Sequence, residues 1–378
     1  MNTMTERYQF STEPITCHSW NKDRSKLALS LNNNEVNIYG RHGAEWRLEE
    51  TLSGHDLRVT GIDWASNTNR IVTCGADRNA YVWTLESDGK WQPTLVLLRI
   101  NRAATCVKWA PQENKFAVGS GARVISVCYF EQENNWWVSK HIKKPILSTI
   151  TTLDWHPNNI LLAAGSADFK VASCNEYLKK NSLQNFLAIF PNNLKIILGH
   201  RIIHFQPPEC AGGWVNAVAF SPDGNKVCWV GHDSSITVAD ATKEMAKSQL
   251  KTEFLPFITI VWVTPKSVVA AGHGCRPWVY SIDDSSKLSQ VTSLDTAQKK
   301  EQGALSAMSK FKSLDRTART DQSDTMLDTV HQNSITGLTM YSGDRNNVTA
   351  ISSCGADSQL VIWTFKTLEQ SIAELQIS

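Results

Sequence analysis

A six-residue pattern of apolar and polar positions recurs along this chain of 378 residues and predicts a repeat protein built from short strands. Each copy begins and ends with an apolar residue. The copies are Ile15 to Trp20, Val59 to Trp64, Ala104 to Trp109, Ile150 to Trp155, Val215 to Phe220, Phe257 to Trp262 and, more weakly, Ile335 to Met340. The first four terminal Trp residues are 44, 45 and 46 residues apart. This period is typical of a four-stranded propeller blade, whose sheet buries its faces only against its neighbours.

The remainder of each period also favours strands. A turn such as Ser221-Pro222-Asp223-Gly224 follows the first pattern, and an apolar stretch such as Arg70 to Cys74 comes next. A tight turn then leads into an alternating third stretch, for example Asn79 to Trp83. Alternation with a period of two, rich in aromatic and β-branched residues, indicates strand rather than helix.

At this level the chain resembles the WD-repeat propellers. In that family a His, a Ser or Thr, an Asp and a Trp form one hydrogen-bonded group in a blade. Two sets of residues fit with identical spacing from the hydroxyl residue onward: His55, Thr73, Asp77 and Trp83, and His331, Ser353, Asp357 and Trp363. A buried Asp must be paired, and the other members supply donors.

Two enzymatic interpretations are weak. A catalytic triad of His, Asp and Ser or Thr is disfavoured because the set repeats at blade positions where burial is expected, and a nucleophile needs access to substrate. A propeller hydrolase would need convergent carboxylates or a metal at the ring axis, and the sequence gives no sign of either. We therefore expect a protein that is not an enzyme and has no catalytic residues or cofactor.

Composition narrows the class of protein. A formal charge of +2 gives no reason to expect a nucleic-acid partner, and no apolar run is long enough for a membrane span. The nine cysteines include no C-x-x-C pair, which favours reduced core thiols. His232, His273 and Cys275 could be drawn together as a metal cluster, but zinc-ligand spacing is missing and turn residues are the better interpretation. We expect no metal.

Two intervals exceed one blade, and we expect the excess on the surface of the ring. The first excess, 172–211 between blades four and five, is unusually apolar for a surface loop, which makes it an aggregation hazard or a binding patch. The second, 295–330 between blades six and seven, is basic, with six Lys or Arg against two acidic residues over 299–319, a local charge of +4.

A short amphipathic helix is predicted within the basic insertion, from Ala304 to Leu314. Its apolar side carries Leu305, Met308, Phe311 and Leu314, with Lys310 opposite. Such a helix fits docking into a groove of a partner protein. Packing back onto its own propeller fits the pattern equally well, because short isolated helices are unstable in water.

Long stretches of the chain resemble the WD-repeat subunits of the actin-related protein 2/3 complex, among them Arg70 to Trp83, Lys115 to Pro145 and Leu153 to Lys170. The resemblance implies a non-catalytic structural and regulatory subunit that supports nucleation of branched actin filaments. Its partners would be the other subunits, actin filaments and nucleation-promoting activators, in the cytoplasmic actin cytoskeleton and also the nucleus.

In that family the insertion before the last blade projects as a helix that contacts actin or an activator. The resemblance therefore makes these residues candidate contacts: Leu305, Met308, Lys310, Phe311, Lys312, Leu314 and Arg316. A different class, a generic WD-repeat adaptor such as a substrate receptor of a ubiquitin ligase, would bind a peptide at the central face and would not depend on Lys310 or Phe311. Trp136 and Trp137 fit either a partner-binding surface or an outer-strand pair packed between blades.

The predicted architecture is all-β, a seven-bladed WD-repeat propeller over 1–378 with a helical insertion between blades six and seven. Ring closure should come from Glu6 to Ser11, which would add the outer strand to the blade formed by Ile335 to Phe365 and remove an exposed edge. We also expect a short terminal helix from Leu368 to Leu375.

Overall fold

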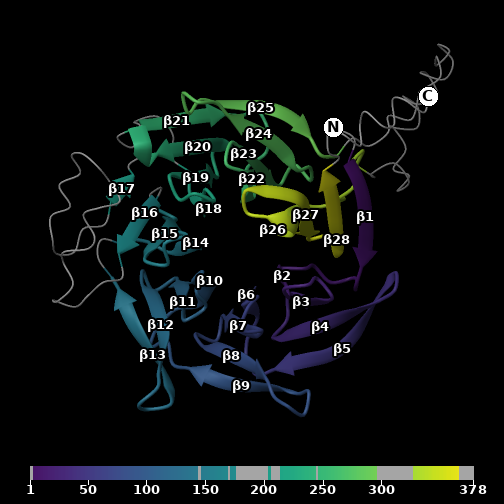
Figure 1. The fold of residues 1–378 in the computed structure, drawn as a ribbon, viewed down its shortest axis with the longest axis vertical. Helices are drawn as coiled ribbons and strands as arrows, with labels where there is room; N and C mark the ends of the chain where they lie inside the picture. Colours follow the sequence, from purple (N-terminus) through teal and green to yellow (C-terminus); the bar gives the residue numbers. More distant parts are fainter. Residues whose placement is uncertain are drawn as a thin grey trace, which may run out of the picture.

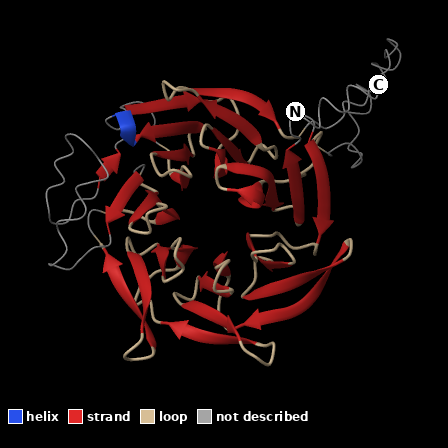
Figure 2. Cartoon of the chain, viewed as in Figure 1, coloured by secondary structure: helices blue, strands red, loops and turns tan. Residues whose placement is uncertain are grey.

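Seven antiparallel sheets of four strands form a closed ring in the computed structural model of this chain (Figure 1). The structure describes residues 3–143, 146–168, 171–175, 203–205, 213–243, 246–295 and 327–365. Strands account for nearly all regular structure in these ranges, and a single 3₁₀ turn, η1 (Ala241–Lys243), is the exception (Figure 2). The predicted seven-bladed propeller is confirmed.

We number the blades along the chain and give the strands of each from the centre of the ring outward. Blades one and two contain β2 (Cys17–Trp20), β3 (Lys26–Ser30), β4 (Glu35–His42) and β5 (Glu45–Ser53), then β6 (Val59–Trp64), β7 (Arg70–Gly75), β8 (Ala80–Leu85) and β9 (Trp91–Val96). Blades three and four contain β10 (Ala104–Trp109), β11 (Lys115–Ser120), β12 (Ile125–Glu131) and β13 (Trp136–Ile142), then β14 (Ile150–Trp155), β15 (Leu161–Ser166), β16 (Val171–Asn175) and β17 (Ile203–Phe205).

The second half of the ring follows the same order. Blades five and six contain β18 (Val215–Phe220), β19 (Lys226–Gly231), β20 (Ser235–Asp240) and β21 (Ala246–Lys251), then β22 (Phe257–Thr264), β23 (Ser267–Gly272), β24 (Trp278–Ile282) and β25 (Leu288–Ser293). Blade seven contains β26 (Ile335–Asp344), β27 (Asn347–Gly355), β28 (Gln359–Phe365) and, as its outer strand, β1 (Thr3–Gln9).

The inner strand of each blade is the recurring six-residue pattern. Four inner strands, β6, β10, β14 and β18, begin and end at the predicted residues. In six blades the pairing with the second strand shifts register after the first residue of the pattern, which is the mark of a β-bulge at its second residue. A bulge turns its side chain away from the regular alternation.

The bulged side chain forms a hydrogen bond with the next blade. Thr60 Oγ1 donates to the carbonyl oxygen of Ala104 at 2.9 Å. The equivalent donors at other junctions are Thr105 to Ile150, Thr151 to Val215, Asn216 to Phe257 and Thr336 to Ile15, at 2.5 to 2.7 Å. Five junctions are thus fastened near the centre of the ring by a polar side chain at the same position of the repeat.

Apolar packing lies between the blades. The buried residues form seven clusters, and each cluster takes its members from two adjacent blades. The cluster between blades two and three, for example, joins Val82 to Trp109 and Phe116. Because the inner part of each sheet is covered on both faces, second strands such as β7, β11 and β15 are continuous buried runs, whereas outer strands such as β5 and β21 are largely exposed.

The two chain ends meet in blade seven. Strand β1 pairs antiparallel with β28, from Thr3 opposite Phe365 to Gln9 opposite Gln359, and lies alongside it in Figure 1. The predicted closure is confirmed, although the strand ends earlier than Glu6 to Ser11. Beyond the strand, Phe10 contacts Tyr39 of blade one edge-on, with ring centroids 4.6 Å apart. The N-terminal segment therefore bridges the last blade and the first.

The two predicted insertions are described only at their ends. In the range 172–211, β16 and β17 are the third and fourth strands of blade four, and β17 pairs with β16 through only three residues. Residues 176–202 and 206–212 lie outside the described part of the chain. The predicted helices over 304–314 and 368–375 also lie outside it, and so do the seven candidate contact residues between 305 and 316.

Removal of β1 tests the closure. Deleting residues 1–11 should destabilise the ring by about 3–6 kcal/mol, because Tyr8 and Phe10 lose their packing and β28 becomes an edge strand. A fall of about 10 °C in the melting temperature is expected. Arg7→Ala, at an exposed position of the same strand, is the control and should melt like the parent. An unchanged transition in the deletion would mean that β1 does not close the ring.

Candidate functional site

The blade-two group is a chain of hydrogen bonds between two strands, the segment before β6 and the turn between β7 and β8. His55, just before β6, contacts Asp77 Oδ2 through Nδ1 at 2.8 Å and Thr73 Oγ1 through Nε2 at 2.8 Å. Trp83 Nε1 donates to the same Thr73 oxygen at 3.0 Å. The structure thus brings together all four residues singled out in the sequence, but Trp83 bonds to the hydroxyl and not to the Asp.

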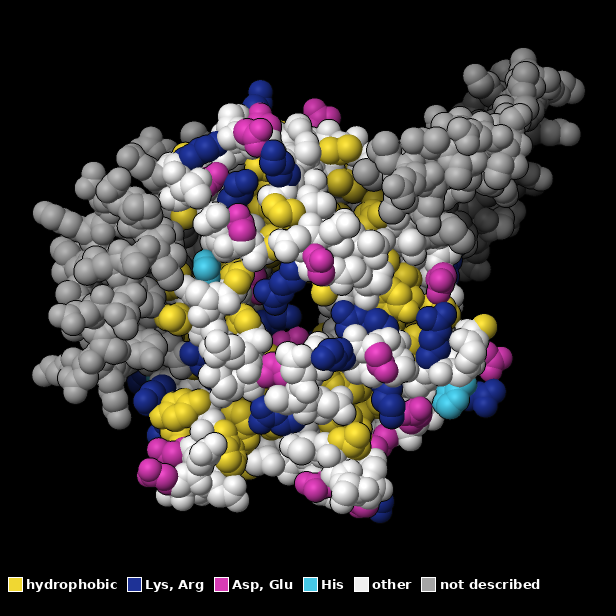
Figure 3. Space-filling model, viewed as in Figure 1, with side chains coloured by type: hydrophobic (Ala, Val, Ile, Leu, Met, Phe, Trp, Pro, Cys, Tyr) yellow, Lys and Arg dark blue, Asp and Glu magenta, His cyan; other side chains and the backbone are white. Residues whose placement is uncertain are grey.

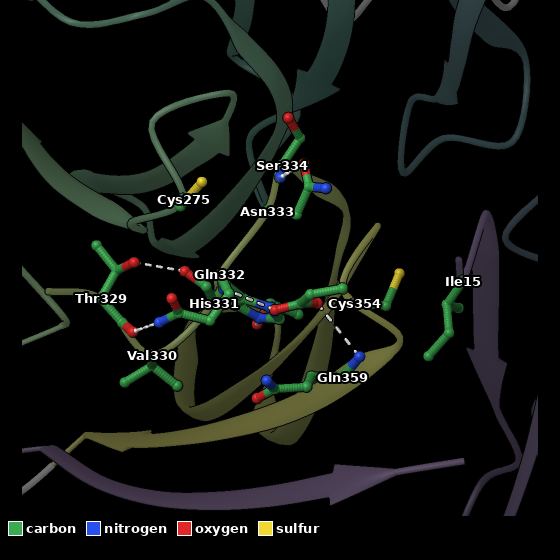
Figure 4. Close-up of polar contacts among 12 residues, drawn as sticks. Ile15, Cys275, Thr329, Val330, His331, Gln332, Asn333, Ser334, Cys354 and Gln359 are labelled. Atoms are coloured by element: carbon green, nitrogen blue, oxygen red, sulfur yellow. Dashed lines mark hydrogen bonds and ion pairs between the residues drawn. The ribbon is translucent and has the colours of Figure 1, made fainter. Parts of the chain in front are cut away.

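The blade-seven group repeats this arrangement. His331 lies 3.1 Å from Asp357 and its Nε2 lies 2.7 Å from Ser353 Oγ, which also accepts from Trp363 Nε1 at 2.8 Å. Asp357 also accepts the backbone N–H groups of Gln332 and Gln359, at 2.8 and 3.2 Å. Figure 4 shows this region, with His331 and Gln332 beside the turn between β27 and β28.

Both groups are buried, which indicates a structural role. Thr73, Ser353 and His331 are all 0% exposed, so neither hydroxyl can reach an external substrate. Burial lowers the pKa of His55, and the neighbouring carboxylate of Asp77 opposes that shift. Burial alone would raise the pKa of Asp357, but its hydrogen bond to His331 and the His331 charge hold that pKa below the ordinary value. These groups fasten the segment before an inner strand to the turn beyond the second strand.

A third polar group lies at the junction of blades seven and one, and the sequence analysis missed it. His18 Nε2 lies 2.9 Å from Ser352 Oγ and 3.0 Å from Thr339 Oγ1, and its Nδ1 lies 3.1 Å from Cys354 Sγ. Trp20 Nε1 donates to Ser352 at 2.8 Å. The sequence signal was His18 itself, because it occupies the fourth position of the pattern, which is apolar in every other copy.

Among the described residues, no carboxylate forms a hydrogen bond with the junction group. Complete burial lowers the pKa of His18 to about 3. The nearest titratable neighbour is the thiol of Cys354, whose pKa burial raises to about 12. Both groups therefore stay neutral near pH 7, so the hydrogen bonds of this junction group join neutral side chains.

Carboxylates on the inner strands also link blades. Asp63 Oδ2 accepts the backbone N–H of Trp109 and Asp154 Oδ2 accepts that of Phe220, both at 2.7 Å. Lys108 Nζ lies 3.2 Å from Asp63 Oδ1, and that charge raises the pKa of Lys108. Burial raises the pKa of Asp154. Lys and Arg side chains gather around the central opening of the ring in Figure 3, so charge of both signs lines it.

The face on which the inner strands begin carries most of the exposed apolar residues in connecting segments. We call it the leading face. On it, in blades two to seven, the turn after the second strand donates a backbone hydrogen bond to the segment before the inner strand, as where Ala76 N donates to Arg58 O at 2.8 Å. Leu57, Leu97 and Leu147, from three consecutive segments, are 55%, 50% and 60% exposed.

Exposed basic side chains occur in the same segments as these leucines and in the adjoining turns. Among the described residues, the exposed cations of blades two to four on this face are Arg58, Arg78, Arg99, Arg102, Arg123 and Lys143. We call this set, with Leu57, Leu97 and Leu147, the basic patch. None of its cations forms an ion pair with a residue in the described ranges. Arg78, Arg99 and Arg123 have positive φ, a backbone conformation in which an Arg is uncommon.

The two adjacent tryptophans of blade three have different environments. Trp137 is 4% exposed and packs in the cluster between blades two and three, beside Trp109 and Phe116. Trp136 is 45% exposed on the other side of β13. Packing between blades is therefore the correct interpretation for Trp137, whereas Trp136 remains available at the surface.

The residues considered as a metal cluster lie in turns. The rings of His232 and His273 have centroids 6.3 Å apart, and His273 Nδ1 lies 3.0 Å from Ser334 Oγ. Cys275 lies at a positive φ in the turn that ends blade six's second strand. Among the residues that the structure describes, no three His, Cys, Asp or Glu side chains are grouped to hold a metal ion.

Comparison with known proteins places these features in a family. The family described as WD domain, G-beta repeat matches residues 46–84, 140–172 and 203–240. Subunit 1A-B of the actin-related protein 2/3 complex from Xenopus laevis is 52% identical over 98% of this chain and 99% of the relative. The chain belongs to the family of subunit 1 of the actin-related protein 2/3 complex.

More distant relatives carry the same family name. Subunit 1 from Schizosaccharomyces pombe is 43% identical over 93% of this chain and 97% of its own length. Subunit 1B from Arabidopsis thaliana is 38% identical over 95% of this chain and 96% of its own length.

The WD match also fits the strand order of the ring. Residues 46–84 run from β5 to β8, so each sequence repeat is offset by one strand from a blade. In the described ranges we find no helix with the length and apolarity to cross a membrane.

Acid should weaken the junction of blades seven and one through His18. Its pKa is about 3 in the folded state and about 6.5 when unfolded, so the unfolded chain gains a proton first as pH falls. Stability contributed by the neutral ring is complete above pH 6.5 and is lost towards pH 3, by about 2 kcal/mol at pH 5.

The measurement is urea unfolding at pH 7 and pH 5. The parent should lose about 2 kcal/mol more than His18→Gln, which keeps hydrogen-bonding capacity without titrating. Equal losses in the two proteins would show that His18 is protonated in the folded ring.

Proposed function

We propose that this chain is a non-catalytic structural and regulatory subunit of an actin-related protein 2/3 complex and supports nucleation of branched actin filaments. The observation that carries the proposal is 52% identity over 98% of the chain to a relative named as subunit 1 of that complex. A ring whose His55, His331 and His18 groups are buried in hydrogen bonds within and between blades suits a scaffold better than an enzyme. The comparisons favour this function over a generic WD-repeat adaptor.

The partners follow from the proposal. Other subunits of the complex would bind the ring, and actin filaments or nucleation-promoting activators would contact the insertion 295–330. The candidate apolar contacts there are Leu305, Met308, Phe311 and Leu314, with Lys310, Lys312 and Arg316 as a basic rim. A subunit with these partners acts in the cytoplasmic actin cytoskeleton, with the nucleus as a second location.

The basic patch is a second contact surface. Its six cations have no ion pair among the described residues, and three exposed leucines come from the same connecting segments. Arginine binds carboxylates through a planar pair of donors. An acidic partner segment that carries apolar side chains matches both features, so we assign this surface to an activator of that composition.

Assembly and insertion contacts can be tested separately. A complex purified with the tagged chain should contain two actin-related proteins and four small subunits. Met308→Ala combined with Phe311→Ala should leave this composition unchanged but reduce branch formation, scored per complex by microscopy of single filaments. Lys299→Ala, which lies in the insertion but outside its apolar contact residues, is the control for an unspecific effect of substitution there. Copurification of ubiquitin-ligase components instead would refute the proposed function.

Charge reversal tests the basic patch. Arg78→Glu with Arg123→Glu should weaken binding of an acidic activator tenfold or more, because each lost charged hydrogen bond is worth about 1.5–3 kcal/mol. The affinity should also fall with added salt in the parent and less so in the variant. Arg47→Glu, exposed on outer strand β5, is the matched control. Equal affinities of all three complexes would place the activator elsewhere.

A further inference from the structure

The neck of the basic insertion is closed by a buried carboxylate. We define the neck as Asp295, where the described chain leaves blade six, and residues 327–332, where it returns to blade seven. Asp295 Oδ2 accepts the backbone N–H of Val330 at 2.7 Å, and both residues are 5% exposed. The two ends of a segment of more than thirty residues are thereby held side by side.

Gln332 folds its side chain back over the returning segment. Its Nε2 donates to the carbonyl oxygens of Leu327 and Thr329, at 3.0 and 2.5 Å, and its Oε1 accepts the backbone N–H of Leu327 at 2.9 Å. One amide therefore satisfies three backbone groups in a segment without regular structure. Arg276 of blade six adds a hydrogen bond to the carbonyl oxygen of Asp328.

The same residue joins the neck to the buried group of blade seven. The backbone N–H of Gln332 donates to Asp357 Oδ2 at 2.8 Å, and Asp357 in turn holds His331 (Figure 4). Through Asp357, His331 and Ser353 this chain of bonds reaches Trp363, which is fully buried. The neck is thus tied to side chains in the buried interior of the blade.

Blade two provides an internal comparison. There the residue after the His is Asp56, and its backbone N–H donates to Asp77 Oδ2 at 3.2 Å in the same way. The connecting segment of blade two is short, however, and the Asp56 side chain is exposed and has no neck to hold. The four-residue group alone therefore does not require a Gln at this position. The side-chain hydrogen bonds of Gln332 instead hold the segment by which the insertion returns to blade seven.

We propose that Gln332 is a positioning residue that fixes the direction in which the insertion leaves the ring, with the His331–Asp357 group as its anchor. The functional part of this inference rests on the proposed contact between the insertion and actin or an activator. Gln332→Met is the informative variant. It keeps the side-chain length and the backbone N–H but removes the three hydrogen bonds made by the side-chain amide.

The first measurement is hydrogen exchange of the assembled complex. In Gln332→Met the amides of Leu327 and Val330 should exchange about 10- to 100-fold faster, since each lost hydrogen bond contributes a factor of up to about ten. The Trp363 region should exchange at the parental rate. Asp56→Ala, the matched change in blade two, should alter neither. Parental exchange at the neck in Gln332→Met would overturn the inference.

The second measurement is branch nucleation at equal incorporation of the chain and equal melting temperature. Gln332→Met should reduce it several-fold, and adding Phe311→Ala should cause little further loss, because both changes disable the same contact. A loosened neck with parental nucleation, while Phe311→Ala alone reduces it, would overturn the inference. Parental nucleation in Phe311→Ala would instead refute the proposed contact, and the exchange result would then decide the role of Gln332 by itself.

Discussion

Every sheet in this ring depends on its neighbours, because a blade has two apolar faces and no core of its own. The constraint is most severe where the chain begins and ends, since only non-covalent contacts hold the ring shut there. The pairing of β1 with β28 meets it. Blade seven is therefore built from strands of both chain ends. Loss of its outer strand would expose the apolar packing of blades seven and one together. The offset of the sequence repeat from the blade by one strand is what makes this closure possible.

Polar side chains then fix the orientation of adjacent blades, which non-directional apolar packing alone does not specify. The bulged second residue of the pattern binds the next blade close to the axis, as Thr60 does with Ala104. The His, Asp, hydroxyl and Trp groups act further out, between a connecting segment and a turn. At the closing seam, adjacent residues serve two different groups: Ser352 bonds with His18 and Trp20 of blade one, while Ser353 bonds with His331 and Trp363 within blade seven. Successive side chains of a strand point to opposite faces, so this division follows directly from the pleat of β27.

The sequence was most informative where one residue type has one physical role. The terminal Trp of the pattern and its apolar positions predicted four inner strands to the residue, and the repeated spacing of His, hydroxyl, Asp and Trp predicted which side chains meet. It was least informative where role depends on a neighbour far along the chain. Trp136 and Trp137 are identical in type, and only the register of β13 against β12 separates the buried one from the exposed one. His18 looked like an exception to a pattern, and its partners lie more than 300 residues away.

The same logic explains where new function can be added to such a ring. The junctions between blades are filled by packing and by bonds that leave little freedom, so variation is tolerated in the connecting segments. A long insertion in one of them costs little loop-closure entropy, but it gains no fixed direction unless its two ends are held. The bonds from Asp295 to Val330 and from Gln332 to Leu327 supply that hold, and they do so beside a buried group that the fold requires in any case. A blade with a complete His–Asp group is therefore a favourable place for an insertion that must present a surface to a partner, because the anchor already exists.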